Sequence, residues 1–381
     1  MKAFKQPLLT ELQTQGIQLQ QSQGMPLSRQ GGAGPSDHIA VLMEGQTVMV
    51  PVHTHAAKQS PFTLEDNTQS GSKRLMRGGI PVTDISFARQ PKFYELATAD
   101  GVPYSQIATL HGTEVLATTV LQNCIRYDQP ETACQFCSIG LSLAAGKTIA
   151  QKTPQQLAEV ARAAVRLDGV KHMVMTTGTP ATRDRGAQVL CDSVQAVKAA
   201  VDIPIQVQCE PPKDLVWLDR LKQSGADTLG LHLEVVAPEV RHRIMPSKAN
   251  ISVAEYLRAF AYAVPLFGRG QVSTYILAGL GDSEEQILTI CDELIALGVY
   301  PFVVPFVPIA GTPLEHHPAP PSAMMNAILQ PLAQRLREAG LTSETSKAGC
   351  ARCGACSSLK SYEKASATTA SSQQSVAGVQ S

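Results

Sequence analysis

Residues Thr153–Thr176, TPQQLAEVARAAVRLDGVKHMVMT, contain a helix signal followed directly by a strand signal. Apolar residues recur at helical spacing over Pro154–Leu167, Thr153 is suited to cap this helix, and Gly169 lies beyond its end. His172–Thr176 is a short apolar run that is typical of a buried strand. The stretch therefore predicts one helix and one strand of an α/β fold.

The same alternation continues along the chain in six strand–helix units. The predicted strands are Val115–Leu121, His172–Thr176, Ile203–Cys209, Thr228–Leu233, Gln271–Leu277 and Phe302–Phe306. The predicted helices are Pro154–Leu167, Arg185–Ala200, Leu215–Gln223, Val253–Val264, Glu284–Leu297 and Ala323–Ala339. Strict alternation implies parallel strands joined by right-handed crossovers. We predict a partial to complete (β/α) barrel of TIM type, whose functional loops follow the carboxyl ends of the strands.

We divide the chain into five parts, of which the barrel, residues 114–340, is the largest. It follows a flexible leader over 1–36 and a small N-terminal extension over 37–113. In the extension, residues 38–52 predict a hairpin about Glu44 and Gly45, and the polar residues 56–80 predict a loop. A cysteine-containing segment, 341–358, follows the barrel, and a tail rich in Ser, Ala and Gln, 359–381, is expected to be disordered.

The chain of 381 residues carries 32 basic and 32 acidic residues, so its net charge is zero. This balance argues against a protein that binds nucleic acid by neutralising phosphates, and against a polybasic membrane-surface protein. Residues 1–30 lack the apolar region of a secretory signal. The uncharged stretch Leu294–Leu314 contains four prolines, which would break a spanning helix. We expect a cytoplasmic protein with neither nucleic-acid nor membrane partners.

Six of the nine cysteines fall into two tight triplets. The first triplet is Cys124, Cys134 and Cys137, the second is Cys350, Cys353 and Cys356, and the remaining thiols are Cys191, Cys209 and Cys291. An odd, clustered set is poor material for a disulfide framework, and clustered thiols in a reducing compartment more often bind metal. We expect the three remaining thiols to be structural or spare ligands.

The first triplet lies in the loop after the first predicted barrel strand. Three thiolates from one loop can hold three irons of a four-iron cluster and leave the fourth iron open to a small-molecule ligand. Zinc is the alternative, but structural zinc usually takes four ligands, and no His or fourth Cys lies nearby in the sequence.

This loop resembles that of the radical S-adenosylmethionine (SAM) enzymes, whose three cysteines follow the first barrel strand. An aromatic residue precedes the last cysteine in that family, as Phe136 precedes Cys137 here. The family's usual spacing is three residues and then two, whereas nine and then two separate the cysteines of this chain. The resemblance implies a 4Fe-4S cluster and SAM as cofactors, on a longer cluster loop.

The resemblance extends to the ends of the second, third and fourth strands. Thr177, Gly178 and Thr179 stand where the family has a Gly-rich segment for the SAM amino group, although an ordinary strand-to-helix turn is the alternative. Glu234 resembles the acidic ribose-binding position of biotin and lipoyl synthases, and Glu210 could also reach the barrel mouth. For each carboxylate the alternative is a salt bridge at the rim.

Four further residues match SAM-contacting positions of the family. Lys248 resembles the basic residue that pairs with the SAM carboxylate in biotin synthase, and Arg243 is near enough to compete for that role. Gly279 lies in a Gly-rich stretch that resembles the one near the adenine, and Ile309 in the segment whose backbone meets the adenine. More narrowly, residues 35–358 resemble an uncharacterised radical SAM family, related to biotin synthase, that is found beside nitrilase genes.

The second triplet, with two residues between successive cysteines, leaves three alternatives open. It could bind an auxiliary iron–sulfur cluster, bind zinc, or act as a set of redox thiols. We favour a second iron–sulfur cluster, although the Cys-Pro of a bacterial ferredoxin run does not follow.

The resemblance implies an enzyme that reductively cleaves SAM at the four-iron cluster. The 5′-deoxyadenosyl radical so formed would abstract hydrogen from a small-molecule substrate, and a flavodoxin or ferredoxin would supply the electron. The main alternative is a non-catalytic iron–sulfur or zinc-binding barrel that serves as an electron carrier or binding module. A degenerate barrel that binds SAM without turnover is the other.

Overall fold

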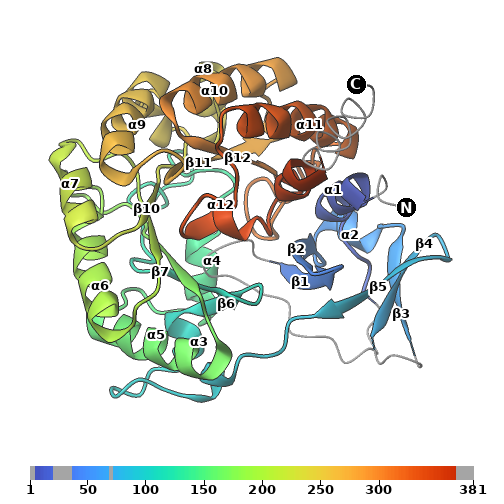
Figure 1. The fold of residues 1–381 in the computed structure, drawn as a ribbon, viewed down its shortest axis with the longest axis horizontal. Helices are drawn as coiled ribbons and strands as arrows, with labels where there is room; N and C mark the ends of the chain where they lie inside the picture. The colour runs from blue at the N-terminus through green and yellow to red at the C-terminus, as the bar shows by residue number, and fades with distance from the viewer. Residues whose placement is uncertain (1–4, 20–36, 68–71, 366–381) are drawn as a thin grey trace, which may run out of the picture.

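A computed structural model describes residues 5–19, 37–67 and 72–365 (Figure 1). Within them the chain forms two sheets, one of five strands near the N-terminus and one of seven strands that is flanked by helices. The larger sheet is curled and open, and the smaller sheet lies beside its open side (Figure 1).

The larger sheet is a partial (β/α) barrel. Its spatial order is β12-β11-β10-β9-β8-β7-β6; β7 to β12 are parallel and β6 is antiparallel to β7. The strands are β6 Thr109–His111, β7 Val115–Thr119, β8 His172–Thr176, β9 Ile205–Gln208, β10 Thr228–Gly230, β11 Val272–Ala278 and β12 Tyr300–Pro305. All six predicted barrel strands are confirmed, with ends that differ by a few residues.

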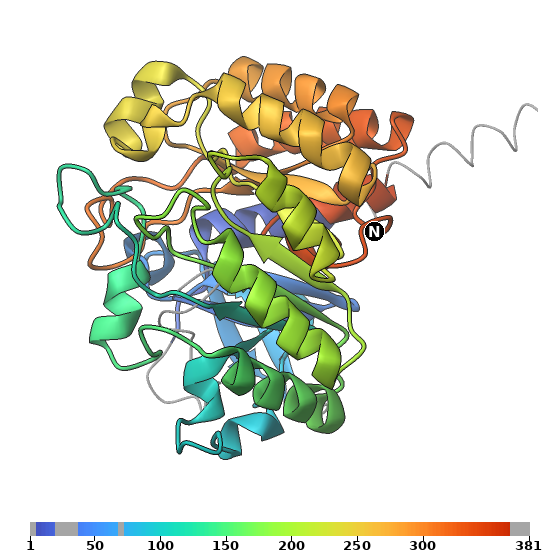
Figure 2. The ribbon, with the colours of Figure 1, turned by 90° about the vertical axis from the view of Figure 1, so that its left-hand side faces the viewer.

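Helices cover the outer face of this sheet, as Figure 2 shows for α5, α6 and α7 in front of it. The barrel helices are α4 Ile139–Ala144, α5 Pro154–Asp168, α6 Ala187–Ala200, α7 Val216–Gln223, α8 Pro238–Ile244, α9 Val253–Phe267, α10 Glu284–Leu297 and α11 Ser322–Glu338. Short elements η2 Lys92–Glu95, α3 Tyr104–Ile107 and η3 Lys248–Asn250 complete this region. The six predicted helices are confirmed, whereas α8 carries no strong sequence signal.

The ends of two barrel helices follow directly from local sequence. Thr153 and Ser283 each form a capping box at the start of α5 and α10, with the glutamine three residues later. Gly169 and Gly298 end these helices in the left-handed conformation, which glycine adopts without steric cost. These signals explain why the sequence predicts both helices closely.

The N-terminal extension is a second, antiparallel sheet with the order β2-β1-β5-β4-β3. Its elements are α1 Lys5–Gln15, β1 His38–Met43, β2 Gln46–Pro51, α2 His55–Lys58, β3 Phe62–Asp66, β4 Lys73–Arg77 and β5 Ile80–Phe87. The hairpin about Glu44 and Gly45 is confirmed. The loop predicted over 56–80 is wrong, because β3 and β4 pair there and bury Phe62, Leu64 and Leu75 beneath a charged outer face.

The flexible leader predicted over 1–36 is also wrong where the structure describes it. Residues 5–15 form α1, and Leu9, Leu12 and Ile17 are fully buried in the core of the small sheet. The segment is rich in glutamine and therefore reads as polar, but its three apolar residues pack against the small sheet. Residues 1–4 and 20–36 lie outside the described part of the chain.

The C-terminal segment is likewise more ordered than we predict. It forms α12, Gly349–Cys353, and residues 359–365 are helical, with Leu359 and Tyr362 buried. Glu363 accepts hydrogen bonds from the Tyr300 hydroxyl at 2.6 Å and from the Ser343 hydroxyl at 2.6 Å. The disordered tail therefore cannot begin at 359, and residues 366–381 lie outside the described part.

The two terminal segments meet each other at the open side of the barrel. The Thr10 and Ser358 hydroxyls are hydrogen-bonded at 2.8 Å. The carbonyl of Ala355 accepts from the Gln13 side chain at 3.1 Å and from the Met49 amide at 2.8 Å.

In the described residues no helix is long and apolar enough to cross a membrane.

Close packing of α12 into the barrel gives a stability test. A Cβ on Gly349 would lie 2.2 Å from the buried Gln206 side chain, whereas one on Gly340 would meet nothing within 4 Å. Both glycines have positive φ, so Gly349→Ala and Gly340→Ala share that cost. We expect Gly349→Ala to lose about 1–3 kcal/mol more, because overpacking adds to the backbone strain. Equal losses in urea-induced unfolding would contradict the packing of α12.

Candidate metal and cofactor site

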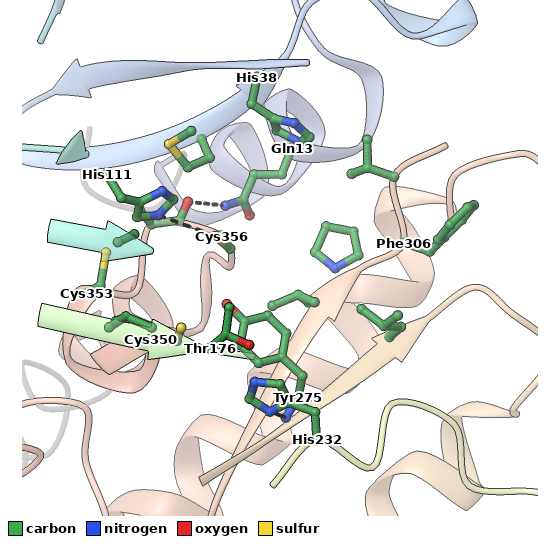
Figure 3. Close-up of a pocket in the computed structure, with 18 of the residues that line it drawn as sticks. Gln13, His38, His111, Thr176, His232, Tyr275, Phe306, Cys350, Cys353 and Cys356 are labelled. Atoms are coloured by element: carbon green, nitrogen blue, oxygen red, sulfur yellow. Dashed lines mark hydrogen bonds between the residues drawn. The ribbon is translucent and has the colours of Figure 1, made fainter. Parts of the chain in front are cut away.

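A cavity of about 320 Å³ lies inside the half-barrel (Figure 3). At one end it is lined by Phe136, Glu234 and Ile309, which follow the carboxyl ends of barrel strands. At the other end it is lined by Cys350, Cys353 and Cys356. Gln13, His38 and Met49 of the N-terminal extension complete the wall. The open side of the barrel is therefore closed by parts of the chain outside the barrel.

The loop from β7 to α4 carries Cys124, Cys134 and Cys137, all partly exposed. The Cys137 amide donates to the Cys134 carbonyl at 3.0 Å, which places these two residues in one turn. The Gln135 amide donates to the Ile244 carbonyl at 2.8 Å and so joins the loop to the end of α8. Phe136 and Cys134 pack against a small apolar cluster that includes Val240 and Phe306. The loop is thus held against the barrel mouth.

The electrostatics of the loop thiols fit a cationic ligand. Burial raises the pKa of Cys137 to about 12, and it also raises the pKa of Cys134. The negative charges of neighbouring thiolates and of Glu234 raise the pKa of Cys134 further. Iron binding at these cysteines would therefore release their protons, because the thiolate is the form that ligates a metal. Among the described residues, no group of three or more His, Cys, Asp or Glu side chains is gathered to hold a metal ion.

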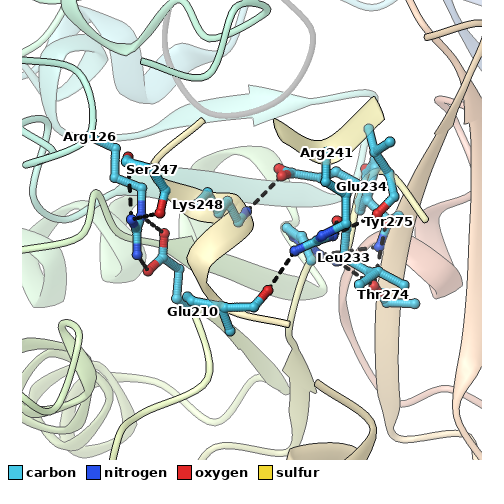
Figure 4. Close-up of polar contacts among 12 residues, drawn as sticks. Arg126, Glu210, Leu233, Glu234, Arg241, Ser247, Lys248, Thr274 and Tyr275 are labelled. Carbon is cyan, nitrogen blue, oxygen red and sulfur yellow. Dashed lines mark hydrogen bonds and ion pairs between the residues drawn. The ribbon is translucent and has the colours of Figure 1, made fainter. Parts of the chain in front are cut away.

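A buried ion pair anchors the loop. The Arg126 guanidinium donates to both carboxylate oxygens of Glu210, the longer contact being 2.7 Å, and to the Ser247 carbonyl at 2.6 Å (Figure 4). Burial by itself raises the pKa of Glu210, but the Arg126 hydrogen bonds outweigh it and hold this pKa below its ordinary value. Glu210 therefore joins the end of β9 to the cysteine loop, which is the salt-bridge alternative of the sequence analysis.

Glu234 and Lys248 form a second pair, at 2.7 Å (Figure 4). Burial alone would lower the pKa of Lys248, but the negative charges of Glu234 and Glu210 raise it, so the ammonium stays charged. Glu234 has a φ of 67° and extends the pairing with β11: its amide donates to the Tyr275 carbonyl and its carbonyl accepts from the Leu277 amide, both at 2.8 Å. The structure thus fixes a carboxylate and an ammonium side by side at the barrel mouth.

Several residues that sequence reasoning missed hold these groups. Arg241 is buried and donates to the carbonyls of Leu233, Val235 and Ile251, between 2.6 and 2.9 Å. Asp282 accepts from the amides of Val236 and Ala237. Arg126 had one signal in the sequence, its position two residues after Cys124, whereas Arg241 had none because it acts on backbone carbonyls.

The predicted SAM-binding segment after β8 lies against the cysteine loop. A Cβ on Gly178 would lie 2.0 Å from the Asn123 carbonyl oxygen, so only glycine permits this approach. The Ile125 amide donates to the Thr179 carbonyl at 2.9 Å, and the Thr177 hydroxyl donates to the Gly178 carbonyl at 2.8 Å. The end of β8 is thereby held next to the first cysteine.

Three other residues that the sequence predicts to contact SAM are Arg243, Gly279 and Ile309. Arg243 donates to the Leu280 carbonyl at 3.0 Å, and so it is tied to the turn after β11 rather than to Glu234. Gly279 has a φ of 102° and its carbonyl is 2.9 Å from His317 Nε2. Ile309 lines the cavity. Glu234 and Ile309 thus line one cavity and Lys248 pairs with Glu234, whereas Arg243 is bonded to the Leu280 carbonyl.

The Arg126–Glu210 pair gives a test with a matched control. Glu210→Gln leaves the largely buried Arg126 without its partner charge, so we expect a loss of about 3–5 kcal/mol in the free energy of unfolding at pH 7. Glu114→Gln breaks the exposed pair with Lys171 and should cost less than about 1 kcal/mol.

The pH dependence of this difference has a defined sign. The pKa of Glu210 is lower in the folded state, so its contribution is complete above the ordinary value of 4.5 and is lost as the pH falls through the lower pKa. Urea unfolding of both variants from pH 7 to pH 3 measures the effect. An equal cost for the two variants at pH 7 would contradict the anchoring role.

Comparisons with known proteins bear on this site. Residues 129–294 match the family described as the radical SAM superfamily, so Cys134 and Cys137 lie within the match and Cys124 just before it. The chain is 28% identical over 208 residues to bacteriochlorophyllide c C-7(1)-hydroxylase of Chlorobaculum limnaeum, across 49% of this chain and 51% of that protein. It thus spans about half the length of this curated relative.

Two solved structures resemble the fold at low identity. Methylornithine synthase (PylB) is 19% identical, with a TM-score of 0.45 over 59% of this chain and 62% of that one. HydG, a maturase of the FeFe hydrogenase, is 15% identical, with a TM-score of 0.46 over 62% of this chain and 52% of that one. The family match stands independently of these likenesses: residues 129–294 of this chain match the radical SAM superfamily.

Proposed function

We propose that this protein is a radical SAM enzyme that acts on a neutral small molecule. The observation that carries the proposal is the three-cysteine loop after the first parallel strand, within which the radical SAM match begins. When bound, a reduced four-iron cluster with an open site supplies the electron that breaks a C–S bond of SAM and yields a 5′-deoxyadenosyl radical.

Cys124, Cys134 and Cys137 would hold this cluster. Their position on one loop that is anchored at the barrel mouth supports the assignment. In our proposal Lys248 pairs with the SAM carboxylate and Glu234 accepts hydrogen bonds from the ribose hydroxyls. Their ion pair supports this, because it holds the two side chains next to each other at the mouth.

The backbone segments at the mouth would complete the SAM site. We assign the amino group to the turn Thr177–Thr179, and the adenine to the segments that contain Gly279 and Ile309. The contact of Gly178 with Asn123 supports the first assignment, because it brings the turn against the cysteine loop. Arg243, which donates to the Leu280 carbonyl in the turn after β11, is the second candidate for the carboxylate.

The cavity supports a neutral, largely apolar substrate. Among the described residues that line it, Glu234 is the one carboxylate, and there is no Lys or Arg. Burial lowers the pKa of His232 to about 3, so its ring is neutral. The Tyr275 amide donates to His232 Nδ1 at 3.3 Å, which leaves the proton on Nε2 as a hydrogen-bond donor. The volume is at the lower end of the range of about 300–1,000 Å³ for ligand pockets.

The chain's own residues would also protect a radical from water. Phe136, Leu277 and Phe306 are apolar groups at the mouth, and the N-terminal extension closes the open side of the barrel.

We further propose that the protein works in the cytoplasm with flavodoxin or ferredoxin as reductant. We also propose that it is related to biotin synthase and to the nitrilase-associated family, a relation that the motifs after the strands support.

SAM cleavage tests the proposal. Anaerobic protein with its full iron content, incubated with SAM and dithionite, should form 5′-deoxyadenosine. Cys134→Ala should lower the rate at least about 100-fold, because the cluster loses a ligand, whereas Cys191→Ala, on α6, should keep the rate within about twofold. Chromatography of the nucleoside measures both. No 5′-deoxyadenosine from the iron-loaded parent would contradict the proposal.

A further inference from the structure

The second cysteine triplet lies inside the half-barrel, at the amino-terminal ends of its strands. The Gly349 amide donates to Nδ1 of His172, the first residue of β8, at 3.2 Å. Thr228, the first residue of β10, donates to the Ala348 carbonyl at 3.3 Å. The chain therefore inserts α12 into the barrel from the end opposite the SAM-binding mouth.

Polar side chains from the strands fix the position of this insertion. The Cys350 amide donates to the Gln206 side chain at 3.1 Å, and the Gln208 side chain donates to Cys350 Sγ at 3.2 Å. Gln206 also bonds Ser273 and Gln208, at 3.1 and 2.7 Å. These amides lie in a buried network, so α12 is held by specific contacts and not by apolar packing alone.

All three thiols of the triplet line the cavity (Figure 3). Cys191 and Cys291 differ from them, since both lie buried within the packing of the barrel helices. A cysteine that only fills space is expected to be buried in this second way. Three thiols that share one cavity wall are instead suited to a common ligand.

Nitrogen and oxygen groups surround the same end of the cavity. His111 Nε2 is 3.7 Å from Cys356 Sγ, and Tyr275 hydrogen-bonds Cys350. His111 therefore offers an imidazole donor next to the triplet, which could complete a set of four protein ligands. The spacing of two residues between cysteines is one that iron–sulfur proteins use to present thiolates from a short segment.

We propose that Cys350, Cys353 and Cys356 ligate a second iron–sulfur cluster at the inner end of the cavity, with His111 as the fourth ligand. The donor set fits by its chemistry, because three thiolates and an imidazole are ligands that iron–sulfur centres accept. Binding of the cluster would draw together side chains that the structure lines along one cavity wall but does not gather at coordinating distances. The triplet and the mouth line one cavity, so a substrate in it lies between the second cluster and SAM. This last clause rests on the proposed function, whereas the existence of the second cluster does not.

Iron and acid-labile sulfide counts test the proposal directly. The full chain is reconstituted anaerobically with iron and sulfide, alongside Cys350→Ser/Cys353→Ser/Cys356→Ser, Cys124→Ser/Cys134→Ser/Cys137→Ser and the control Cys191→Ala. We expect each triple variant to lose part of the parent's iron and sulfide, the two losses to sum to the parent's content, and the control to lose none. A C-terminal variant that keeps all the iron, or a parent that carries zinc at this triplet, would overturn the proposal.

Two measurements keep the test informative if a triple variant folds poorly. The Mössbauer spectrum of the unsubstituted protein loaded with iron-57 should contain two cluster components, and a single component would overturn the proposal. His111→Ala should alter the component that the C-terminal triple variant loses and leave the other unchanged; if it alters neither, His111 is not a ligand. Full iron in the variant lacking the three loop cysteines would contradict the proposed function instead, so the two failures are distinguishable.

Discussion

The open side of the half-barrel is the constraint on which the rest of the structure depends. Parallel sheets are stable when both faces are covered, because their strands are apolar on both sides. Helices α5 to α11 cover the outer face, but six parallel strands do not close on themselves here. The inner face is covered by the N-terminal sheet and the C-terminal segment, which meet at Ala355. Both ends of the chain therefore form walls of the cavity.

This arrangement gives the cavity two chemically different ends. At the carboxyl ends of the strands, two buried ion pairs hold charged groups beside the cysteine loop. At the amino ends, side-chain amides and the imidazoles of His111 and His172 lie around a second set of thiols. The middle is mostly apolar, with neutral His232 and Tyr275 among its polar groups. In our proposals, a neutral substrate would fit between the two ends.

The barrel could be predicted from the sequence because each of its elements has a local signal. Capping residues such as Thr153 and Ser283 and terminal glycines such as Gly169 mark helix ends without tertiary information. The N-terminal sheet could not be predicted in the same way. Its strands β3 and β4 alternate charged and apolar residues, and α1 is rich in glutamine, so only packing on a partner reveals Leu9, Leu12 and Phe62 as core.

The candidate site also has a part that the sequence predicts and a part that only the tertiary structure reveals. The cysteine positions follow from spacing alone, whereas the pairing of Arg126 with Glu210 and of Lys248 with Glu234 joins residues that are distant in the chain. The shared cavity of the two triplets is also beyond sequence reasoning, because it depends on α12 entering the barrel from its amino-terminal end.

The central claim is that the loop of Cys124, Cys134 and Cys137 presents an iron with an open position to SAM. Mössbauer spectra of the iron-57 protein, recorded with and without SAM, test it most directly. Our account predicts that SAM changes the spectrum of one iron site, and that this change is absent when the three loop cysteines are replaced by serine. A spectrum that SAM leaves unchanged, in protein with its full iron content, would contradict it.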